Sequence, residues 1–363
     1  MTKPRLLALV QLPPPIHGVS RANQVLLNDP QLLDQFEVTV LNLSYGGTKA
    51  SRGQASTGRI LYGLTIITRL IRALRTTDLV YLTPALQGHA LWRDAMIARL
   101  ITRFNVPYVL HPHSGGIGTD DQDRPFGNRL RRAVERMFSN AQRVLLLHES
   151  IRDGYEGYLS NDQSITYVGN GVPRVEAYPF PNTNMPLRLA FIGNLIPYKG
   201  FHHAIEVVRE SPQATLDVVG DFSDKNYEAQ IRRQIEKHQL GDRIVFHGRQ
   251  EPDEAWSSFE RCHFLVFTSD WKEGLPLVWL ESMIRGLPIA SFKIGAWRLL
   301  EEAPTPILAE VGDCTTLVQG MHKLISHAEH YLDVRRSIAE QAHAEYASER
   351  WAQRIVRALK QAV

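Results

Sequence analysis

Two glutamates are the first residues whose types and spacing suggest chemistry. Glu273 and Glu281 lie in the segment Thr268–Glu281, which follows an apolar run and leads into a helical pattern. Eight residues are about two helical turns, so one carboxylate can lie before the helix and the other on it, facing one cleft. Carboxylates bind the hydroxyls of ribose and hexose through charge-assisted hydrogen bonds. The alternative is a helix that carries two solvated glutamates.

The loops before two helices of the C-terminal half suggest a site for an anion. The first loop presents Gly274, Leu275 and Pro276. Free backbone N–H groups at the start of a helix favour an anion such as a diphosphate. The second loop contains Asn194 and ends in Lys199-Gly200, where the ammonium can meet a phosphate that the backbone attracts. The alternative for Lys199 is an exposed loop lysine.

A proline-rich loop, residues 13–20, follows the first apolar run of the chain. Its single glycine, Gly18, lets backbone N–H groups approach a phosphate, and Ser20 is the expected N-cap of the next helix. The GxGxxG spacing is missing, so the loop does not support a dinucleotide fingerprint.

A fourth segment places two histidines, His111 and His113, at the end of a predicted strand, followed by Gly115 and Gly116. Residues two apart on a strand point to the same face, so the two imidazoles are expected side by side. A metal site is the alternative, but the spacing suggests no third ligand. No DxD motif precedes a strand end, and residues 120–123 are interpreted as an acidic loop. We therefore expect no metal and no cofactor.

The totals describe an ordinary globular chain that is long for one core. Its 363 residues exceed the size at which single cores stop growing, roughly 250–300 residues, so two domains are expected. The two cysteines, Cys262 and Cys314, cannot form a disulfide framework and indicate buried residues in a reducing compartment. Leu6–Val10 is too short for the apolar region of a signal peptide, and no apolar run is long enough to span a membrane.

Short apolar runs alternate with longer helical patterns in both halves of the sequence, which predicts βαβ units and parallel sheets. The expected strands are residues 5–12, 36–43, 78–83, 107–112, 143–147, 164–168, 188–192, 215–219, 243–246, 264–268 and 288–292. The expected helices are residues 21–27, 59–75, 86–104, 126–138, 201–210, 227–239, 253–259, 277–286, 314–326, 331–345 and 349–362.

The prolines at 173, 179, 181 and 186 indicate an interdomain linker. The predicted fold is α/β, with two facing Rossmann-like domains over residues 1–172 and 187–347, and residues 173–186 between them. A C-terminal helix, residues 348–363, is expected to pack on the N-terminal domain. Open α/β sheets bind ligands at the carboxyl ends of their strands.

Charge is distributed unevenly between the halves. Residues 1–178 hold 20 Lys and Arg against 14 Asp and Glu, a net +6, whereas residues 179–363 hold 21 against 24, a net −3. The excess is almost all arginine, and it fits an anionic membrane surface or a phosphorylated acceptor. The helix at 59–75 has an apolar stripe and exposed arginines, which fits either a membrane surface or packing on the sheet. Ordinary surface arginine is the other explanation.

These segments, in this order, resemble the retaining GT-B-fold glycosyltransferases of family 4. Glu273 and Glu281 match the family's E-x7-E pair, and the Gly-Asn-Leu…Lys-Gly segment before residue 201 matches its diphosphate loop. The loop with Gly18 matches the family's N-terminal glycine loop, and Asn170-Gly171-Val172 matches the motif that begins its linker. The resemblance spans nearly the whole chain and is strongest over residues 187–300.

The resemblance implies roles for individual residues. Glu281 would bind the ribose, Glu273 the donor sugar, and Lys199 with the amides of Gly274 and Leu275 the diphosphate. Gly18 would close over the phosphates, and His113, with His111 as its competitor, would contact acceptor or donor sugar. The remaining implied contacts are Pro276 and Asn194 with the donor, Gly248 and Arg249 with the base, and Gly115 and Gly116 on the acceptor side. The family often has an arginine where this chain has Asn194, so Lys199 or Arg249 would supply the missing charge.

The sequence thus predicts a retaining hexosyltransferase that uses a nucleotide diphosphate sugar and a glycan or lipid-linked acceptor, in cell-surface polysaccharide or glycolipid synthesis. Two alternatives stay open: a nucleotide-sugar epimerase of the same fold, and a non-catalytic nucleotide-sugar-binding module. The expected location is the cytoplasm, with peripheral attachment to the inner face of the plasma membrane as a further hypothesis. No nucleic-acid partner is expected.

Overall fold

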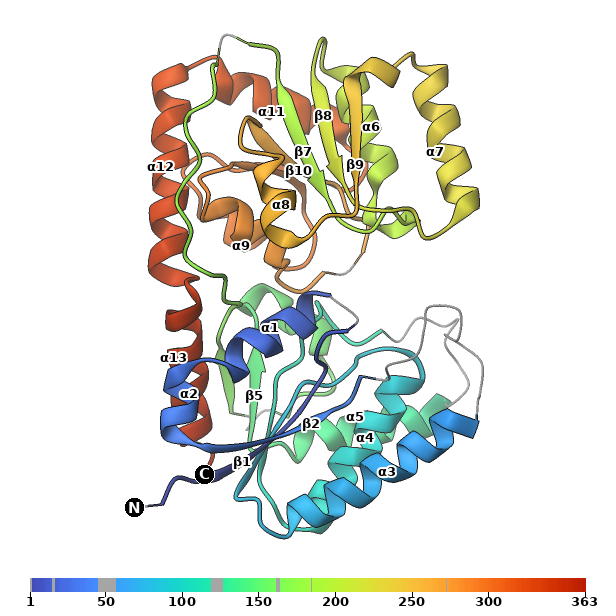
Figure 1. The fold of residues 1–363 in the computed structure, drawn as a ribbon, viewed down its shortest axis with the longest axis vertical. Coiled ribbons are helices and arrows are strands. Elements are labelled where there is room, and N and C mark those ends of the chain that lie inside the picture. The colour runs from blue at the N-terminus through green and yellow to red at the C-terminus, as the bar shows by residue number, and fades with distance from the viewer. Residues whose placement is uncertain are drawn as a thin grey trace. The chain divides into compact units, whose positions relative to one another are not determined.

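The computed structural model describes residues 2–14, 17–44, 57–118, 127–160, 164–183, 185–271 and 273–363, with no side-chain description for 57–64. The chain divides into two compact units (Figure 1). The first unit comprises residues 1–171 and 348–363, and the second comprises residues 172–347. The proline-rich residues 173–186 belong to the second unit. The acidic residues 120–123 lie outside the described ranges.

The first unit is built on a parallel six-stranded sheet in the order β2-β1-β3-β4-β5-β6. Its strands are β1 (Arg5–Val10), β2 (Glu37–Asn42), β3 (Leu79–Leu82), β4 (Tyr108–Leu110), β5 (Arg143–Leu146) and β6 (Ile165–Tyr167). β1 pairs in register with β2 from Arg5 opposite Glu37, and with β3 from Leu6 opposite Leu79. The interior strands β1 and β3 are almost wholly buried, as expected of a parallel sheet covered on both faces.

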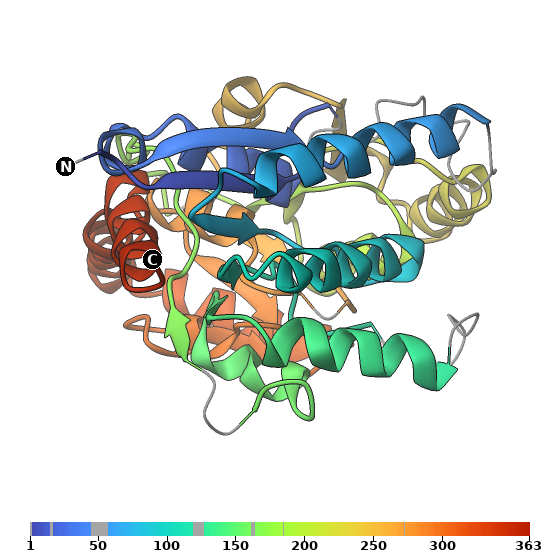
Figure 2. The same ribbon diagram turned by 90° about the horizontal axis from the view of Figure 1, so that it is seen from below.

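Helices cover both faces of this sheet (Figures 1 and 2). They are α1 (Gly18–Leu27), α2 (Pro30–Gln35), α3 (Thr57–Leu74), α4 (Gly88–Arg103), α5 (Gly127–Ser139) and α13 (Ser348–Lys360). α13 joins α1 and α2 in one apolar core, to which it contributes Trp351, Ile355 and Leu359. Trp351 is fully buried and its indole N–H donates to the Gly169 carbonyl at 3.1 Å.

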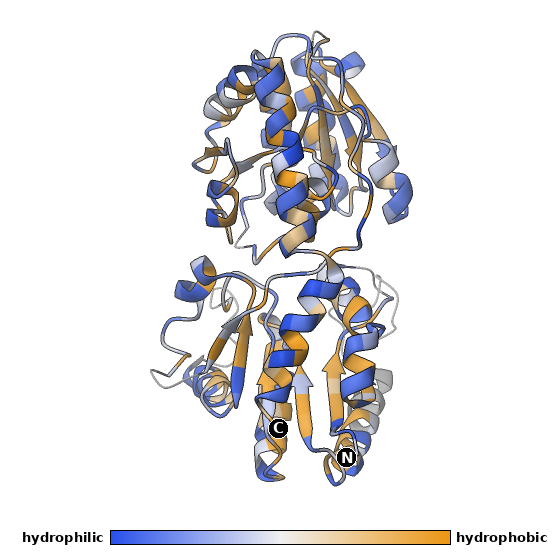
Figure 3. Ribbon diagram, turned by 90° about the vertical axis from the view of Figure 1, so that its left-hand side faces the viewer, coloured by the Kyte–Doolittle hydropathy of each residue, from blue (hydrophilic) through white to orange (hydrophobic). Residues whose placement is uncertain are grey.

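The second unit repeats the architecture with a parallel sheet in the order β12-β11-β10-β7-β8-β9. Its strands are β7 (Arg188–Ile192), β8 (Thr215–Val219), β9 (Ile244–Gly248), β10 (Phe264–Phe267), β11 (Ile289–Phe292) and β12 (Ile307–Ala309). Its helices are α6 (Phe201–Glu210), α7 (Lys225–Lys237), α8 (Pro252–Ser257), α9 (Leu277–Met283), α10 (Arg298–Glu301), α11 (Cys314–Ile325) and α12 (Ala328–Glu345). α6 packs against α11, and α9 packs against α12. In both units the strands are predominantly hydrophobic (Figure 3).

The predicted α/β fold of two parallel sheets is confirmed, and the described residues also form short elements that the pattern did not predict, among them α2, β12 and α10. α2 begins at a recognisable signal, because Asp29 caps it by accepting from the Gln31 N–H at 2.8 Å and Pro30 is its first residue. β12 is three residues long and pairs with β11 at the edge of its sheet, beside two prolines that hide the strand pattern. α10 has only four residues.

The predicted cap of α1 is wrong. His17 is the N-cap, and its Nδ1 accepts from the Ser20 N–H at 3.3 Å. Ser20 lies in the first turn, and its hydroxyl oxygen accepts from the His17 N–H at 3.0 Å, which completes a capping box. A histidine caps less often than serine, so the sequence favoured the wrong residue.

Cys262 and Cys314 are both buried, as predicted. Among the described residues, no helix combines the length and the apolar character that crossing a membrane requires.

Candidate functional site

In the second unit, the loops that carry most predicted site residues all leave the carboxyl ends of strands. Backbone hydrogen bonds join the carboxyl ends of β7, β8 and β9. The Gly193 N–H donates to the Val219 carbonyl at 3.0 Å, and the Gly220 N–H donates to the Gly248 carbonyl at 2.9 Å. β10 lies beside β7, so the loop that follows it lies at the same edge of the sheet. Parallel strands place these carboxyl ends at one edge, where open α/β sheets bind ligands.

Lys199 and Glu273 form an ion pair between two of these loops. Lys199 Nζ donates to Glu273 Oε1, although the residues are 74 positions apart in the sequence. Ser269 Oγ lies 3.0 Å from the same Oε1 and 3.0 Å from the Tyr198 carbonyl oxygen, so its hydroxyl can donate to either. The lysine side chain is 29 % exposed and the glutamate 14 %, so the pair is shielded yet open to a ligand.

A close approach of two backbones fixes the position of Lys199. Gly200 has φ +66°, and a Cβ atom there would lie 1.7 Å from the Thr268 carbonyl oxygen. Only glycine fits such a contact and such a φ value. The Thr268 hydroxyl also donates to the Gly200 carbonyl at 2.9 Å. The Lys199 loop is thereby locked against the start of the loop that leads to Glu273.

The second glutamate of the pair lies on helix α9. Pro276 is the N-cap of this helix, so Gly274 and Leu275 lie just before it. Glu281 is 4 % exposed, and Arg285 donates to its backbone carbonyl at 2.8 Å. The structure thus places Glu273 in the loop and Glu281 on the helix, as the eight-residue spacing predicts.

Asn194, predicted to contact the donor, and Gly248 and Arg249, predicted to contact its base, lie at the ends of β7 and β9. Asn194 is exposed directly after β7. Gly248 ends β9 with φ +70°, beside an irregularity in the pairing of β8 with β9, and Arg249 follows it as an exposed side chain. The family often has an arginine where this chain has Asn194. Arg249 is an exposed arginine on a loop at the same edge of the sheet.

In the first unit, His111 and His113 follow β4, with ring centroids 4.1 Å apart on one face, as alternation predicts. His111 is fully buried, and its Nδ1 lies 2.6 Å from the Tyr81 hydroxyl. Burial and the neighbouring His113 lower the pKa of His111 well below its ordinary value. Burial and nearby His17 lower the pKa of His113 to about 3. Both rings are therefore neutral at physiological pH.

The Nε2 atoms of His111 and His113 are buried without a hydrogen-bond partner among the described residues. A buried polar atom without a hydrogen-bond partner lowers the stability of the folded protein. A bound ligand that supplies the missing partner removes this cost.

The glycines near these histidines have a structural explanation. A Cβ atom at Gly116 would lie 2.7 Å from the Gly154 carbonyl oxygen, and one at Gly154 would lie 1.9 Å from that of Gly115. The two backbones therefore pack directly on each other, which positions the segment after His113. Gly18 is the first residue of α1, next to the capping residue His17.

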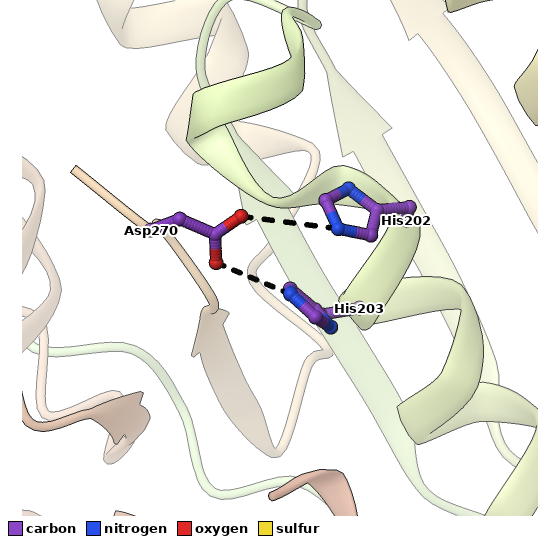
Figure 4. A group of neighbouring side chains, drawn as sticks. All are labelled: His202, His203 and Asp270. Carbon is purple, nitrogen blue, oxygen red and sulfur yellow. Dashed lines mark ion pairs between the residues drawn. The ribbon is translucent and has the colours of Figure 1, made fainter. Parts of the chain in front are cut away.

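Two groups of residues escaped the sequence reasoning. Ser269, which bridges Glu273 and the Tyr198 carbonyl, carried only the weak signal of a hydroxyl at a strand end. His202 and His203, in the first turn of α6, converge with Asp270, in the loop after β10 (Figure 4), and the adjacent histidine pair was the signal that could have drawn attention to them.

Comparisons with known proteins agree with this architecture. The sequence profile described as "Glycosyl transferases group 1" matches residues 179–343, and "Glycosyl transferase 4-like domain" matches residues 22–171. An uncharacterized glycosyltransferase of Haemophilus influenzae is 27% identical over 274 residues, which are 70% of this chain and 71% of the relative. A 2-deoxystreptamine N-acetyl-D-glucosaminyltransferase of Streptomyces fradiae is 26% identical over 72% of this chain, but the match spans only 65% of its own length, just under two thirds.

Solved structures share the whole fold. Anabaena Alr3699/HepE in complex with UDP and glucose superposes with a TM-score of 0.76 at 19% identity, over 98% of this chain and 99% of that one. Sucrose-phosphate synthase from Thermosynechococcus elongatus also gives a TM-score of 0.76, at 15% identity and with 98% of both chains covered. These structures show the GT-B fold of two Rossmann-like domains, and the two matching profiles show that the chain is a glycosyltransferase. The chain belongs to the group 1, family 4-like glycosyltransferases.

Proposed function

We propose that this enzyme transfers a hexosyl residue from a nucleoside diphosphate sugar to an acceptor hydroxyl, with retention of the anomeric configuration. The observation that carries the proposal is the Lys199–Glu273 pair, which joins two loops at the carboxyl edge of the second sheet. HepE, whose structures contain UDP, UDP and glucose, or UDP-glucose, has the same fold and supports a nucleotide-sugar donor.

The ion pair suggests how the donor is received. In the absence of a ligand, Glu273 neutralises the ammonium of Lys199. A diphosphate carries more negative charge than one carboxylate, so it takes the place of Glu273 beside Lys199. The freed carboxylate then accepts hydrogen bonds from hydroxyls of the donor sugar. One exchange of partners thus prepares both the diphosphate contact and the sugar contact.

Catalysis follows from stabilising the leaving group. As the bond between sugar and diphosphate breaks, negative charge grows on the departing phosphate. Lys199 and the backbone amides of Gly274 and Leu275 are preorganised to receive that charge, and Glu281 holds the ribose. Such preorganised electrostatic contacts are usually the largest catalytic contribution. The neutral His113 is a hydrogen-bonding partner for a sugar hydroxyl in the first unit.

A donor screen tests the proposal. Uridine, guanosine and adenosine diphosphate sugars are added singly, and the melting temperature with each is compared with that of the ligand-free protein. A ligand at 100 times its Kd should add about 2.7 kcal/mol to the free energy of unfolding. The stabilising donor is then incubated with and without glycan and lipid-linked acceptors. Acceptor-dependent transfer with retention supports the proposal, whereas an epimerised donor formed without acceptor identifies an epimerase, and binding without turnover identifies a binding module.

We also propose that the first unit docks on an anionic membrane surface, which fits a lipid-linked acceptor in cell-surface glycan or glycolipid synthesis. A groove of about 830 Å³ lies between α4 and α5. Five arginines line it together with Trp92 and Met96: Arg99, Arg103, Arg129, Arg132 and Arg136. Each basic residue near an anionic surface contributes about 1 kcal/mol, which salt screens.

Vesicle flotation tests this docking. The protein should float with anionic vesicles at low salt, float less at high salt, and fail to float with neutral vesicles. Arg99→Glu with Arg132→Glu should abolish flotation. Arg232→Glu with Arg233→Glu makes the same change of charge on exposed α7 and should leave flotation intact. Absence of binding at low salt, or equal loss in both double variants, rejects the groove as the docking surface.

A further inference from the structure

Three side chains with metal-binding atoms converge in the second unit, outside the groups assigned to the donor. His202 and His203 lie in the first turn of α6, and Asp270 lies in the loop after β10. Their functional groups point toward one another (Figure 4). His203 Nε2 is 3.1 Å from Asp270 Oδ1, and His202 Nε2 is 3.8 Å from Oδ2. One ligand atom of each residue lies within 4.8 Å of the other two.

We propose that His202, His203 and Asp270 bind a divalent transition-metal ion of the Zn²⁺ type. Tetrahedral Zn²⁺ holds nitrogen and oxygen ligands at about 2.0–2.2 Å, which places neighbouring ligand atoms roughly 3.3 Å apart. The distance from His203 Nε2 to Asp270 Oδ1, 3.1 Å, is close to this value, whereas His202 Nε2 lies 3.8 Å from the other carboxylate oxygen, Oδ2, so binding one ion requires the side chains to adjust. Two imidazoles and one carboxylate suit Zn²⁺, Co²⁺ or Ni²⁺, whereas Mg²⁺ prefers oxygen ligands alone.

Surrounding residues hold the histidines in a suitable state. His202 Nδ1 lies 3.2 Å from the Tyr227 hydroxyl, so a proton on Nδ1 leaves the Nε2 lone pair directed at the ion. The same hydroxyl accepts from the His202 backbone N–H at 3.3 Å, and burial raises the pKa of Tyr227 to about 12. The His203 ring packs edge-on against Phe292, with centroids 5.2 Å apart.

A simple ion pair explains the arrangement less well. The two imidazole rings have centroids 4.0 Å apart, so two positive charges there would repel each other. The three side chains are 21–33 % exposed, so an ion has access from solvent.

The ion would tether two loops of the donor site. Lys199 precedes His202 by three residues, and Glu273 follows Asp270 by three. The Asp270 N–H already donates to the Tyr198 carbonyl at 3.0 Å, so the loops touch beside the metal ligands. The role of the ion is to hold these loops together. This role is separate from the transfer chemistry, for which no metal is expected.

The test uses untagged full-length protein, stripped with chelator and then titrated with Zn²⁺ by calorimetry and with Co²⁺ by visible absorption. We expect one ion per chain at this site, a Co²⁺ spectrum of tetrahedral intensity, and a higher melting temperature with Zn²⁺. His203→Ala and Asp270→Asn should each weaken binding by more than about 100-fold, since the loss of even an outer-shell partner costs about 10–100-fold. Tyr227→Phe, which keeps the ring and removes the hydroxyl, should weaken it by about 10-fold.

His238→Ala is the matched control. His238 is also partly exposed and faces one carboxylate, Glu206, at 3.9 Å, but it is not part of the cluster. This variant should keep the wild-type affinity and spectrum. Absence of a tetrahedral Co²⁺ spectrum in the wild type overturns the proposal. Unchanged binding in both His203→Ala and Asp270→Asn, or equal loss in His238→Ala, overturns it as well. Nucleotide binding, measured separately, reports whether a variant has kept its fold.

Discussion

The two units place ionisable side chains at the carboxyl ends of strands in opposite electrostatic states. In the second unit, Lys199 and Glu273 form an ion pair with each other. In the first unit, burial holds His111 and His113 neutral, with their Nε2 atoms unpartnered among the described residues. A paired charge can be exchanged for a charged ligand, whereas a neutral buried imidazole can offer only a hydrogen bond.

This difference matches the two kinds of ligand that we propose. A nucleoside diphosphate needs cations and amides, which the second unit supplies. An acceptor or sugar hydroxyl needs neutral donors and acceptors, which the first unit supplies. The comparison therefore predicts that removing charge disables the second unit, and that adding charge disables the first.

The largest expected effect comes from Lys199→Ala. The lysine is a preorganised contact of the departing diphosphate, and losing such a contact typically costs ~2.7–4 kcal/mol, or about 100–1,000-fold in rate. We expect kcat to fall by that factor while the melting temperature of the protein changes little. Steady-state transfer assays on the identified donor measure the effect. Lys199→Arg should restore only part of the rate, because a planar guanidinium meets phosphate differently from an ammonium.

Two controls accompany this substitution. Lys237→Ala removes an exposed lysine of α7 and should leave kcat unchanged. Chelator should leave wild-type transfer active. Near-normal kcat in Lys199→Ala would contradict the assignment, as would a complete loss of activity on chelation, restored by added metal, in His203→Ala, which lacks the proposed loop-tethering ion.

A smaller effect is expected from Glu281→Gln. Its buried carboxylate is proposed to accept hydrogen bonds from the ribose, and losing the charge should weaken nucleotide binding by roughly 1–3 kcal/mol. Titration calorimetry with the nucleoside diphosphate measures this directly. Glu340→Gln, on the exposed face of α12, should have no effect. Unchanged affinity in Glu281→Gln would mean that the ribose lies elsewhere.

The smallest effect concerns acidification of the first unit. The pKa of His113 is about 3 in the folded state and about 6.5 in the unfolded chain, so below pH 6.5 the unfolded state binds a proton that the folded state does not. Stability is therefore lost as pH falls, by about 0.7 kcal/mol per such histidine between pH 7 and pH 6.

Differential scanning calorimetry at pH 7 and pH 6 measures this loss of stability. His113→Gln keeps a polar side chain but does not titrate, so the transition of the first unit should shift less with pH than in the wild type. An equal shift in both proteins would show that the folded protein protonates His113 as readily as the unfolded chain does, contrary to the lowered pKa.

The sequence was most informative where local patterns decide the structure. β7, β8 and α6 have the predicted boundaries, because each is a clean apolar or amphipathic run between turn residues. The spacing of Glu273 and Glu281 likewise predicted a loop residue and a helix residue. These relations depend only on neighbouring positions.

Contacts between distant segments could not be predicted in this way. The pairing of Lys199 with Glu273 depends on Gly200 packing against Thr268, which only the tertiary structure shows. The convergence of His202 and His203 with Asp270 has the same origin, since α6 and the loop after β10 meet through the neighbouring strands β7 and β10. β12 was not predicted, because an edge strand of three residues is too short to show an alternating hydrophobic pattern.

The place of α13 in the first core has a consequence for biosynthesis. The ribosome makes all of the second unit between Gly171 and Ser348, the two ends at which the first unit is interrupted. Until Trp351, Ile355 and Leu359 emerge, the apolar sides of α1 and α2 lack the helix that covers them. The second unit can therefore mature first, although the first unit is begun earlier. A chain in which Gly171 is joined to Ser348 by a short linker should give the first unit as an independently folding protein.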